Sequence, residues 1–194
     1  MSMSSDKSLE DPRALGAAAL DELGAVVRQL DPAGFEAFVA ELAAARRLVL
    51  HGVGREGLMM KALAMRLFHL GLDAHVLGDM TTPPLAAGDL LVVSAGPGWF
   101  SSIAALAETA KAAGARVACV TAQPQGRVPQ AADCIFHIPA QTMADDQSGG
   151  TSVLPMGSLF EGAQFVVFEL VVLALRDRIG ETAESMRARH TNME

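Results

Sequence analysis

The sequence is poor in cysteine, in aromatic residues and in basic charge. Its 194 residues include two cysteines, one tryptophan and no tyrosine. A chain of this length buries about 70% of the surface that its unfolded form exposes, so its core needs no disulfide. The formal net charge is −7, and no cluster of lysine and arginine offsets it. We therefore expect neither nucleic acid nor a membrane surface as a partner.

Long hydrophobic runs are also missing. Hydrophobic residues make up 51% of the chain, but they lie in short runs, and the longest, residues 165–175, contains Glu169. We expect that run to be too short to span a bilayer. Residues 1–13 have no apolar centre, so we expect no signal peptide and predict a cytoplasmic location.

The few cysteines and histidines suggest no metal site. Cys119 and Cys134 each lie in an apolar, strand-like run, which predicts free buried thiols; a disulfide or a metal-binding pair is the alternative. No metal-ligand spacing is found among the histidines His51, His69, His75 and His137.

Helical and strand-like segments alternate along most of the chain. Polar residues 1–11 predict a flexible N-terminus. A helix is predicted from Pro12, and Asp31 followed by Pro32 indicates the N-cap and first residue of a second helix. Strands are predicted at residues 47–51, 74–77, 90–93, 116–121 and 134–138, helices after the first and third of these, a helical turn at 128–132, and a long helix at 157–179. The alternation predicts one α/β domain over residues 12–194, with helices on both faces of a parallel sheet.

Residues 89–115 predict a strand, a glycine-rich loop and a helix. The loop is residues 95–98 (AGPG), and Ser101 and Ser102 are expected to cap the following helix. In an open parallel sheet such a loop lies where ligands bind, beside the free N–H groups of a helix N-terminus. A tight connection without a ligand would show the same glycines, so both interpretations stay open.

A second glycine pattern suggests a different function. Residues 52–57 (GVGREG) fit the G-x-G-x-x-G pattern of dinucleotide-binding proteins, and Asp79 follows the next strand, where an acid would bind a ribose. Against this, Arg55 and Glu56 are bulky charged residues where pyrophosphate needs a close approach to the backbone. An NAD(P)-binding protein is therefore an alternative hypothesis.

The long helix carries two further expectations. Its apolar residues lie on nearly all sides between residues 165 and 175, so we predict a homo-oligomer with residues 157–190 in the interface. Glu161 lies near the start of this helix, where a carboxylate is commonly structural. The alternative is a general base directed into the crevice at the end of the sheet.

Several segments together resemble the SIS (sugar isomerase) domain, and within it the 6-phospho-3-hexuloisomerase group. The similarity runs from about Pro12 onward. Its matching segments are residues 52–55 (GVGR), 64–71 (AMRLFHLG), 146–148 (DQS), 155–161 (PMGSLFE) and 189–194 (RHTNME).

The resemblance implies a five-stranded parallel sheet flanked by helices, in the flavodoxin-like three-layer arrangement, and a tetramer whose active sites are completed by neighbouring subunits. It also implies aldose–ketose isomerisation through an enediol(ate), without metal or organic cofactor. The family's carboxylate base falls on Glu161. Its histidine falls on His190 and is expected to reach a neighbouring subunit's site. Arg55 is expected to contact an anion or a hydroxyl.

The sequence departs from this family in the second loop. The group has S-G-S-G-E-T where this chain has residues 95–100 (AGPGWF), and it has serine where this chain has Glu56. The hydroxyls that hold a sugar phosphate are missing, Pro97 lacks an N–H group, and Glu56 would repel phosphate. We still expect the substrate-binding residues in the two loops, at Gly54, Arg55, Glu56, Ala95, Gly96, Gly98, Trp99, Ser101 and Ser102.

Two functions follow from the resemblance and its departures. The first is a sugar or sugar-phosphate isomerase. The alternative is a non-catalytic protein that binds a carbohydrate derivative or has a regulatory role. Trp99 and Phe100 are expected to stack on a sugar or on a neighbouring subunit, or else to pack within the fold.

Overall fold

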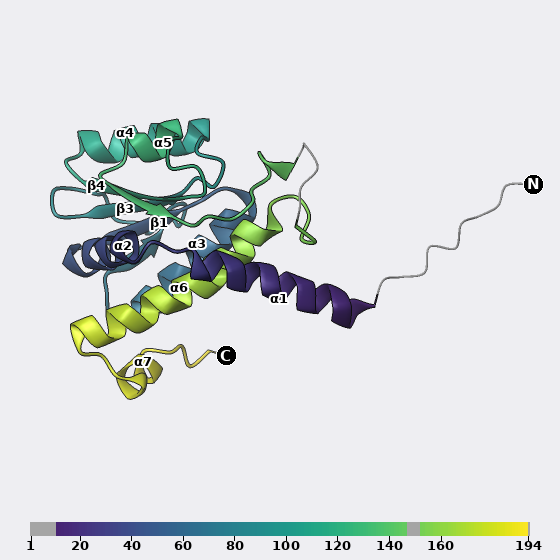
Figure 1. Cartoon of the computed structure of the whole chain (residues 1–194). Coiled ribbons are helices and arrows are strands. Elements are labelled where there is room, and N and C mark those ends of the chain that lie inside the picture. The colour runs from purple at the N-terminus through teal and green to yellow at the C-terminus, as the bar shows by residue number, and fades with distance from the viewer. Residues whose placement is uncertain (1–10, 147–151, 194) are drawn as a thin grey trace, which may run out of the picture.

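Five short apolar runs form the strands of one parallel sheet (Figure 1). The computed structural model describes residues 11–146 and 152–193. The strands are β1 (Leu48–His51), β2 (Ala74–Val76), β3 (Leu90–Ser94), β4 (Arg116–Thr121) and β5 (Cys134–His137). Their order is β2-β1-β3-β4-β5 and every neighbouring pair is parallel. This is the flavodoxin-like order, as expected from the resemblance.

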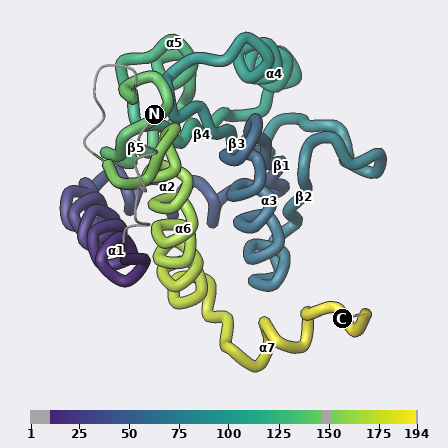
Figure 2. Tube along the Cα trace, turned by 90° about the vertical axis from the view of Figure 1, so that its right-hand side faces the viewer, coloured from purple at the N-terminus to yellow at the C-terminus, as the bar shows by residue number. Residues whose placement is uncertain are grey.

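Helices cover both faces of the sheet. They are α1 (Pro12–Arg28), α2 (Pro32–Ala44), α3 (Gly54–His69), α4 (Ser101–Ala112), α5 (Arg127–Gln130), α6 (Ser158–Ile179) and α7 (Ala183–Ala188). One face is covered by α4 and α5 and the other by α2, α3 and α6, with α1 lying against α6 (Figures 1 and 2). Alternate strand residues enter the two cores: Leu48 and Leu50 face α2, α3 and α6, whereas Val49 faces α4. The predicted fold, a parallel sheet with helices on both faces, is confirmed.

The helix starts show how far local signals decide structure. Asp31 caps α2 as expected, because its carboxylate accepts hydrogen bonds from the N–H groups of Ala33 and Gly34 at 3.2 and 2.9 Å. The expectation that serine caps α4 is wrong. The N-cap is Phe100, which forms no side-chain capping bond, and Ser101 and Ser102 lie one step later in the first turn.

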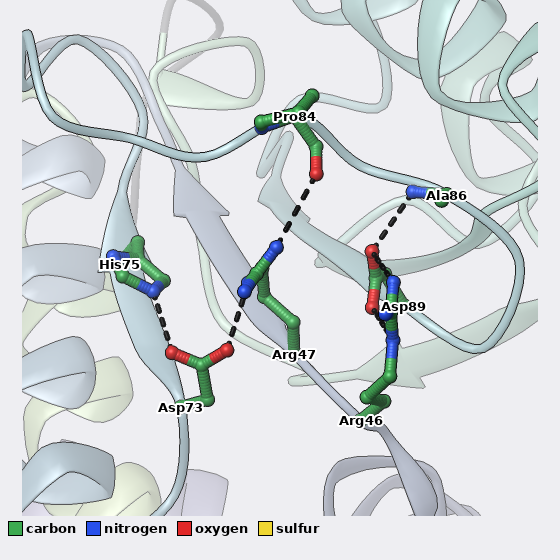
Figure 3. Close-up of polar contacts among 7 residues, drawn as sticks. All are labelled: Arg46, Arg47, Asp73, His75, Pro84, Ala86 and Asp89. Atoms are coloured by element: carbon green, nitrogen blue, oxygen red, sulfur yellow. Dashed lines mark hydrogen bonds and ion pairs between the residues drawn. The ribbon is translucent and has the colours of Figure 1, made fainter.

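The amino ends of β1, β2 and β3 are joined by polar contacts (Figure 3). Arg46 donates two hydrogen bonds of 2.9 Å to Asp89, whose side chain is fully buried and also accepts from the N–H of Ala86 at 2.8 Å. Burial alone would raise the pKa of Asp89, but these bonds outweigh it and leave the pKa below its ordinary value. Asp73, just before β2, accepts from Arg47 at 2.7 Å. These contacts hold the amino ends of the three strands together, at the end of the sheet opposite the carboxyl ends of the strands.

Helix α6 behaves as a core helix despite its composition. With 22 residues, the helix could cross a membrane by length and composition. The expectation that its apolar run is too short to span a bilayer is therefore wrong. Half of its most apolar window is buried within the fold, against α1, α2 and α3. Its outer face is different, because Phe165 and Leu173 are 56% and 48% exposed.

The thiols are as expected in the described residues. Cys119 and Cys134 are both free and buried. Burial raises the pKa of Cys119 to about 12 and that of Cys134 to about 11, so neither is a reactive thiolate near neutral pH. The predicted flexible segment falls on residues 1–10, outside the described residues, and on Asp11, the N-cap of α1.

Candidate active site

A cavity of about 470 Å³ opens at the carboxyl ends of the strands. Four segments meet there: the start of α3, the second glycine loop, the chain after β5, and the start of α6. Its lining residues are Val53, Gly54, Arg55, Glu56, Pro97, Phe100, Thr142, Met143, Met156, Gly157, Phe160 and Glu161. Both glycine loops and the start of the long helix therefore contribute to one site.

Glu161 projects into this cavity from the first turn of α6. Its side chain is only 16% exposed, and its Oε2 atom lies 3.3 Å from an Arg55 nitrogen. Burial raises the pKa of Glu161 above its ordinary value, while the positive charge of Arg55 acts in the opposite direction. Within the described residues Oε2 accepts no hydrogen bond. A largely buried carboxylate with a raised pKa in the lining of a cavity has the properties of a general base.

Arg55 connects the first glycine loop to the start of α6. Its guanidinium donates to the Ser158 hydroxyl at 2.7 Å and to the carbonyl oxygen of Met156. Met156 has a φ of 56° and Gly157 a φ of 77°, a left-handed pair that turns the chain into α6. Because Arg55 binds this turn and Glu161 together, it fixes the base relative to the loop.

Glu56 is buried rather than exposed to an incoming phosphate. The residue is 6% exposed, and its Oε2 atom accepts hydrogen bonds from the Ser94 hydroxyl and from the Gly96 N–H, the latter at 2.9 Å. Gln164, one turn after Glu161 on α6, donates to the same hydroxyl at 2.8 Å. Glu56 was expected to repel a phosphate, but its carboxyl faces the protein's own donors.

The second glycine loop has no backbone donor left to offer between residues 95 and 98. The N–H of Ala95 donates to Val120, that of Gly96 to Glu56 and that of Gly98 to Ala95, at 2.9, 2.9 and 2.8 Å. Pro97 has no N–H. Residues 95–98 therefore offer no free backbone donor to a ligand, and Pro97 is the residue among them that lines the cavity.

Comparison with known proteins agrees with the fold. The SIS domain family model matches residues 41–163. The chain belongs to the SIS domain family. This SIS domain is 41% identical to the 3-hexulose-6-phosphate isomerase of Mycobacterium gastri over 174 residues, 90% of this chain and 87% of the relative. It is 40% identical to the Bacillus subtilis protein of the same name, over 74% of this chain and 77% of the relative.

A solved structure extends the likeness to three dimensions. The crystal structure of a hypothetical protein from Methanococcus jannaschii, whose authors infer a 3-hexulose-6-phosphate isomerase function, has a TM-score of 0.78. It shares 25% sequence identity over 96% of this chain and 100% of its own. The recognised family, the sheet and its order are thus confirmed.

Several expected binding residues of the SIS domain lie outside the cavity lining. Ala95 belongs to the core beneath α4, and Gly98 packs against Gly126, since a Cβ on Gly98 would lie 2.9 Å from the Gly126 Cα. Trp99 stacks under the Arg127 guanidinium, 4.1 Å from the ring centre, so its contact is within the fold. Ser101 and Ser102 are exposed.

His190 lies far from Glu161 of the same chain. Its ring stacks on His69 with a centroid distance of 5.2 Å, and His69 is the last residue of α3, whereas Arg55 is in its first turn. At 1.5 Å per residue these two ends of α3 are about 20 Å apart. Figure 2 likewise shows α7 and the C-terminus beyond the far end of α6.

The glycine loop and the acidic residue of the dinucleotide-binding pattern line different cavities. Gly54 lines the cavity with Glu161, whereas Asp79 lines a separate groove between the segment after β2 and α4. Gly57 is needed for packing, because a Cβ there would lie 2.5 Å from the Gly52 carbonyl oxygen. This separation argues against the NAD(P)-binding alternative.

Sequence reasoning missed some residues at the site. Thr142 and Met143 come from a segment that was expected only to be a loop, and the contacts of Ser94 and Gln164 join segments 70 residues apart. One local signal was available: Gly157, which opens α6 and lies against Met143.

Residues 147 and 148 of the DQS segment, and Glu194, lie outside the described residues. In the described parts of the chain, no cluster of three or more His, Cys, Asp or Glu side chains could hold a metal ion.

Proposed function

We propose that this protein is a sugar-phosphate isomerase that moves a carbonyl group through an enediol(ate), with Glu161 as its base. The single observation that carries the proposal is the Glu161 carboxylate, which is largely buried, is paired with Arg55 and lines a cavity large enough for a sugar. The relatives named 3-hexulose-6-phosphate isomerase support the class of substrate. As implied for the family, the reaction uses no metal or organic cofactor.

In this mechanism Glu161 takes the proton from the carbon next to the carbonyl group and returns it to the neighbouring carbon. Burial raises the pKa of Glu161, and the Arg55 charge acts in the opposite direction by favouring the ionised form, which is the state a base needs. Arg55 also stabilises negative charge that develops on a substrate oxygen in the same cavity.

The phosphate group has few donors left at the second loop. The N–H groups of residues 95 to 98 are occupied or absent. The next part of the chain that combines hydroxyls with free N–H groups is the first turn of α4, which follows Phe100. There Ser101 and Ser102 present hydroxyls and N–H groups at the positive end of the helix. We therefore propose that these two serines, rather than Ala95, Gly96 and Gly98, hold the phosphate.

The first test is conversion of 6-phospho-3-hexulose to fructose 6-phosphate, for the wild type and for Glu161→Gln. Removing a general base is expected to lower kcat by about 10²- to 10⁴-fold. Glu108→Gln is the control, since Glu108 is exposed on α4, outside the cavity lining and outside the proposed interface. It is expected to keep the wild-type rate within a few-fold. An unchanged rate in folded Glu161→Gln would remove Glu161 as the base.

The closed second loop favours one alternative function. A protein that binds a carbohydrate derivative without turning it over does not need the hydroxyl and N–H donors that hold a phosphate at the second loop. Such a protein would show ligand-dependent thermal stabilisation without product. Turnover at an ordinary enzymatic rate would contradict this alternative.

We further propose that the active form is a homo-oligomer, a tetramer as implied for the family, with residues 157–190 in its interface. Apolar side chains are exposed on the outer faces of two adjacent helices, Leu58, Met65 and Phe68 on α3 and Phe165, Val166 and Leu173 on α6. Such an area on a soluble domain marks a contact surface. In the assembly His190 would complete a neighbouring subunit's site. The domain limits 12–194 and a cytoplasmic location are part of the same proposal.

A further inference from the structure

Glu56 places a second carboxyl group in the cavity of Glu161, at a position where the 6-phospho-3-hexuloisomerase group has serine. Its Oε2 atom is the acceptor of two bonds, from the Ser94 hydroxyl and from the Gly96 N–H. Gln164 donates to the Ser94 oxygen, so the Ser94 hydrogen is directed at Glu56. Three residues from β3, the second loop and α6 thus fix the orientation of this carboxyl.

The other oxygen of Glu56 is left for the cavity. In residues 11–146 and 152–193, both hydrogen bonds to the carboxyl end on Oε2, and Oε1 accepts none. Glu56 lines the cavity, and its Oε1 lies 2.9 Å from where a Gly96 Cβ would be. Because Oε2 already accepts two donors, a proton held by Glu56 is placed on Oε1, the oxygen available to a substrate.

The charges around the two carboxyls are arranged unequally. Arg55 pairs with Glu161, while the charged group that acts on Glu56 is Glu161 itself. Burial raises the pKa of Glu56, the Glu161 charge raises it further, and the bonds from Ser94 and Gly96 lower it less than burial raises it. On β4, the Cys119 thiol is neutral. Of the two carboxyls, Glu56 is the one whose surroundings favour the protonated form, because Arg55 pairs with Glu161 and, in the described residues, no cation pairs with Glu56.

We propose that Glu56 is a second catalytic residue, which carries the proton between two adjacent substrate oxygens through Oε1 while Glu161 carries the proton between the two carbons. The inference rests on the proposed isomerase function and adds the residue that completes the proton balance. Two carboxyl groups with opposite protonation states in one cavity are a recurring way to provide acid and base together.

The proton balance closes without any other reactant. With fructose 6-phosphate, Glu161 takes the hydrogen of carbon 3 as a proton, the electron pair of that bond forms the double bond between carbons 2 and 3, and the carbonyl electron pair moves to the oxygen on carbon 2, which gives an enediolate. In a second step this oxygen takes the Glu56 proton. The product of this step is the neutral 2,3-enediol. Glu56 then takes the proton of the oxygen on carbon 3, a carbonyl forms there, and Glu161 gives its proton to carbon 2. Both carboxyls return to their starting states.

The test separates carbon exchange from isomerisation. The full-length protein is incubated with fructose 6-phosphate in D₂O, deuterium at carbon 3 is followed by NMR, and 6-phospho-3-hexulose is measured in parallel. Glu56→Gln keeps the shape of the side chain and an oxygen that accepts from Ser94 and Gly96, but it cannot pass on a proton. We expect isomerisation to fall by about 10²- to 10⁴-fold, while deuterium exchange falls by less than about 10-fold.

Two control variants and the wild type make the outcome decisive. Glu161→Gln is expected to lose exchange and isomerisation together, and Glu108→Gln to keep both. Folded Glu56→Gln with wild-type isomerisation, or with equal losses of exchange and isomerisation, would overturn the role of Glu56 and leave that of Glu161 intact. Absence of both activities in the wild type would instead remove the proposed function.

A measurement on the wild type covers the case in which Glu56→Gln fails to fold. As the pH rises through the titration of Glu56, isomerisation is expected to fall while exchange continues, because only the oxygen-to-oxygen step needs the Glu56 proton. A merely structural Glu56 would not split the two profiles. Parallel pH profiles for exchange and isomerisation would therefore overturn the proposal.

Discussion

The two ends of helix α6 allow a matched test of how the active site is positioned. Gly157 at its start and Gly180 at its end have almost the same left-handed backbone, with φ of 77° and 73°. They differ in their surroundings. A Cβ on Gly157 would lie 2.6 Å from the Met143 nitrogen and 3.0 Å from the Thr142 carbonyl carbon, whereas one on Gly180 would meet nothing within 4 Å.

Alanine at each position is therefore expected to cost different amounts. The left-handed conformation costs a residue with a Cβ about 1–2 kcal/mol, and this applies to both variants. Gly157→Ala also forces apart the start of α6 and residues 142–143, an overpacking cost of about 1–3 kcal/mol. We expect a loss of unfolding free energy of about 2–5 kcal/mol for Gly157→Ala, and about 1–2 kcal/mol for Gly180→Ala.

Urea unfolding followed by circular dichroism measures both values, with unchanged m-values as the check that the unfolded states are comparable. Activity provides a second readout. A shift of about 1 Å in the first turn of α6 moves Glu161 relative to Arg55 and is expected to lower kcat by about 10²-fold, while Gly180→Ala keeps the rate. If the two variants are equally destabilised and equally active, the close contact of Gly157 with Met143 does not position the site.

Three further predictions concern the rest of the molecule. Asp89→Asn is expected to cost about 1–3 kcal/mol of unfolding free energy at neutral pH through weakened bonds to Arg46 and the backbone. Because the folded pKa of Asp89 is lowered, its stabilisation is present above the ordinary aspartate pKa and lost as the pH falls through the folded value; denaturation at pH 7 and pH 3 should show the difference between variant and wild type shrinking. Cys119 is expected to react with iodoacetamide only as fast as the protein unfolds, because it is buried and its pKa is raised to about 12; rapid labelling of the native protein, read by mass spectrometry, would contradict this. Phe165→Lys on the exposed face of α6 is expected to shift the protein from oligomer to monomer in analytical ultracentrifugation, and an unchanged sedimentation coefficient would place the interface elsewhere.

Much of the fold follows from patterns that are local in the sequence. Asp31 followed by Pro32 is a capping signal within one turn of α2, and the apolar strand runs predicted all five strands to within about a residue or two. Such signals depend on neighbours along the chain, so they survive without knowledge of tertiary contacts. The failure at Ser101 is of the same kind, since the cap position shifted by one residue to Phe100.

The site was only partly predictable, because its key contacts join distant segments. Glu56 and Gly96 are 40 residues apart and Arg55 and Ser158 are 103 apart. The resemblance to a family located Glu161 and the two loops. It could not show that a glutamate in place of serine would turn inward and occupy the Gly96 N–H, since that depends on the space beneath the loop. Trp99 was assigned to the site for its residue type, and its Arg127 partner lies on α5.

The order in which the chain is synthesised gives α6 a further consequence. This helix packs against α1, α2 and α3, yet it is made after every strand of the sheet. Until the ribosome has released residues 158–179, the inner faces of the three earlier helices and the sheet between them lack their cover. A nascent chain therefore carries an open apolar surface through most of its synthesis, and closure of that surface and arrival of Glu161 are one late event.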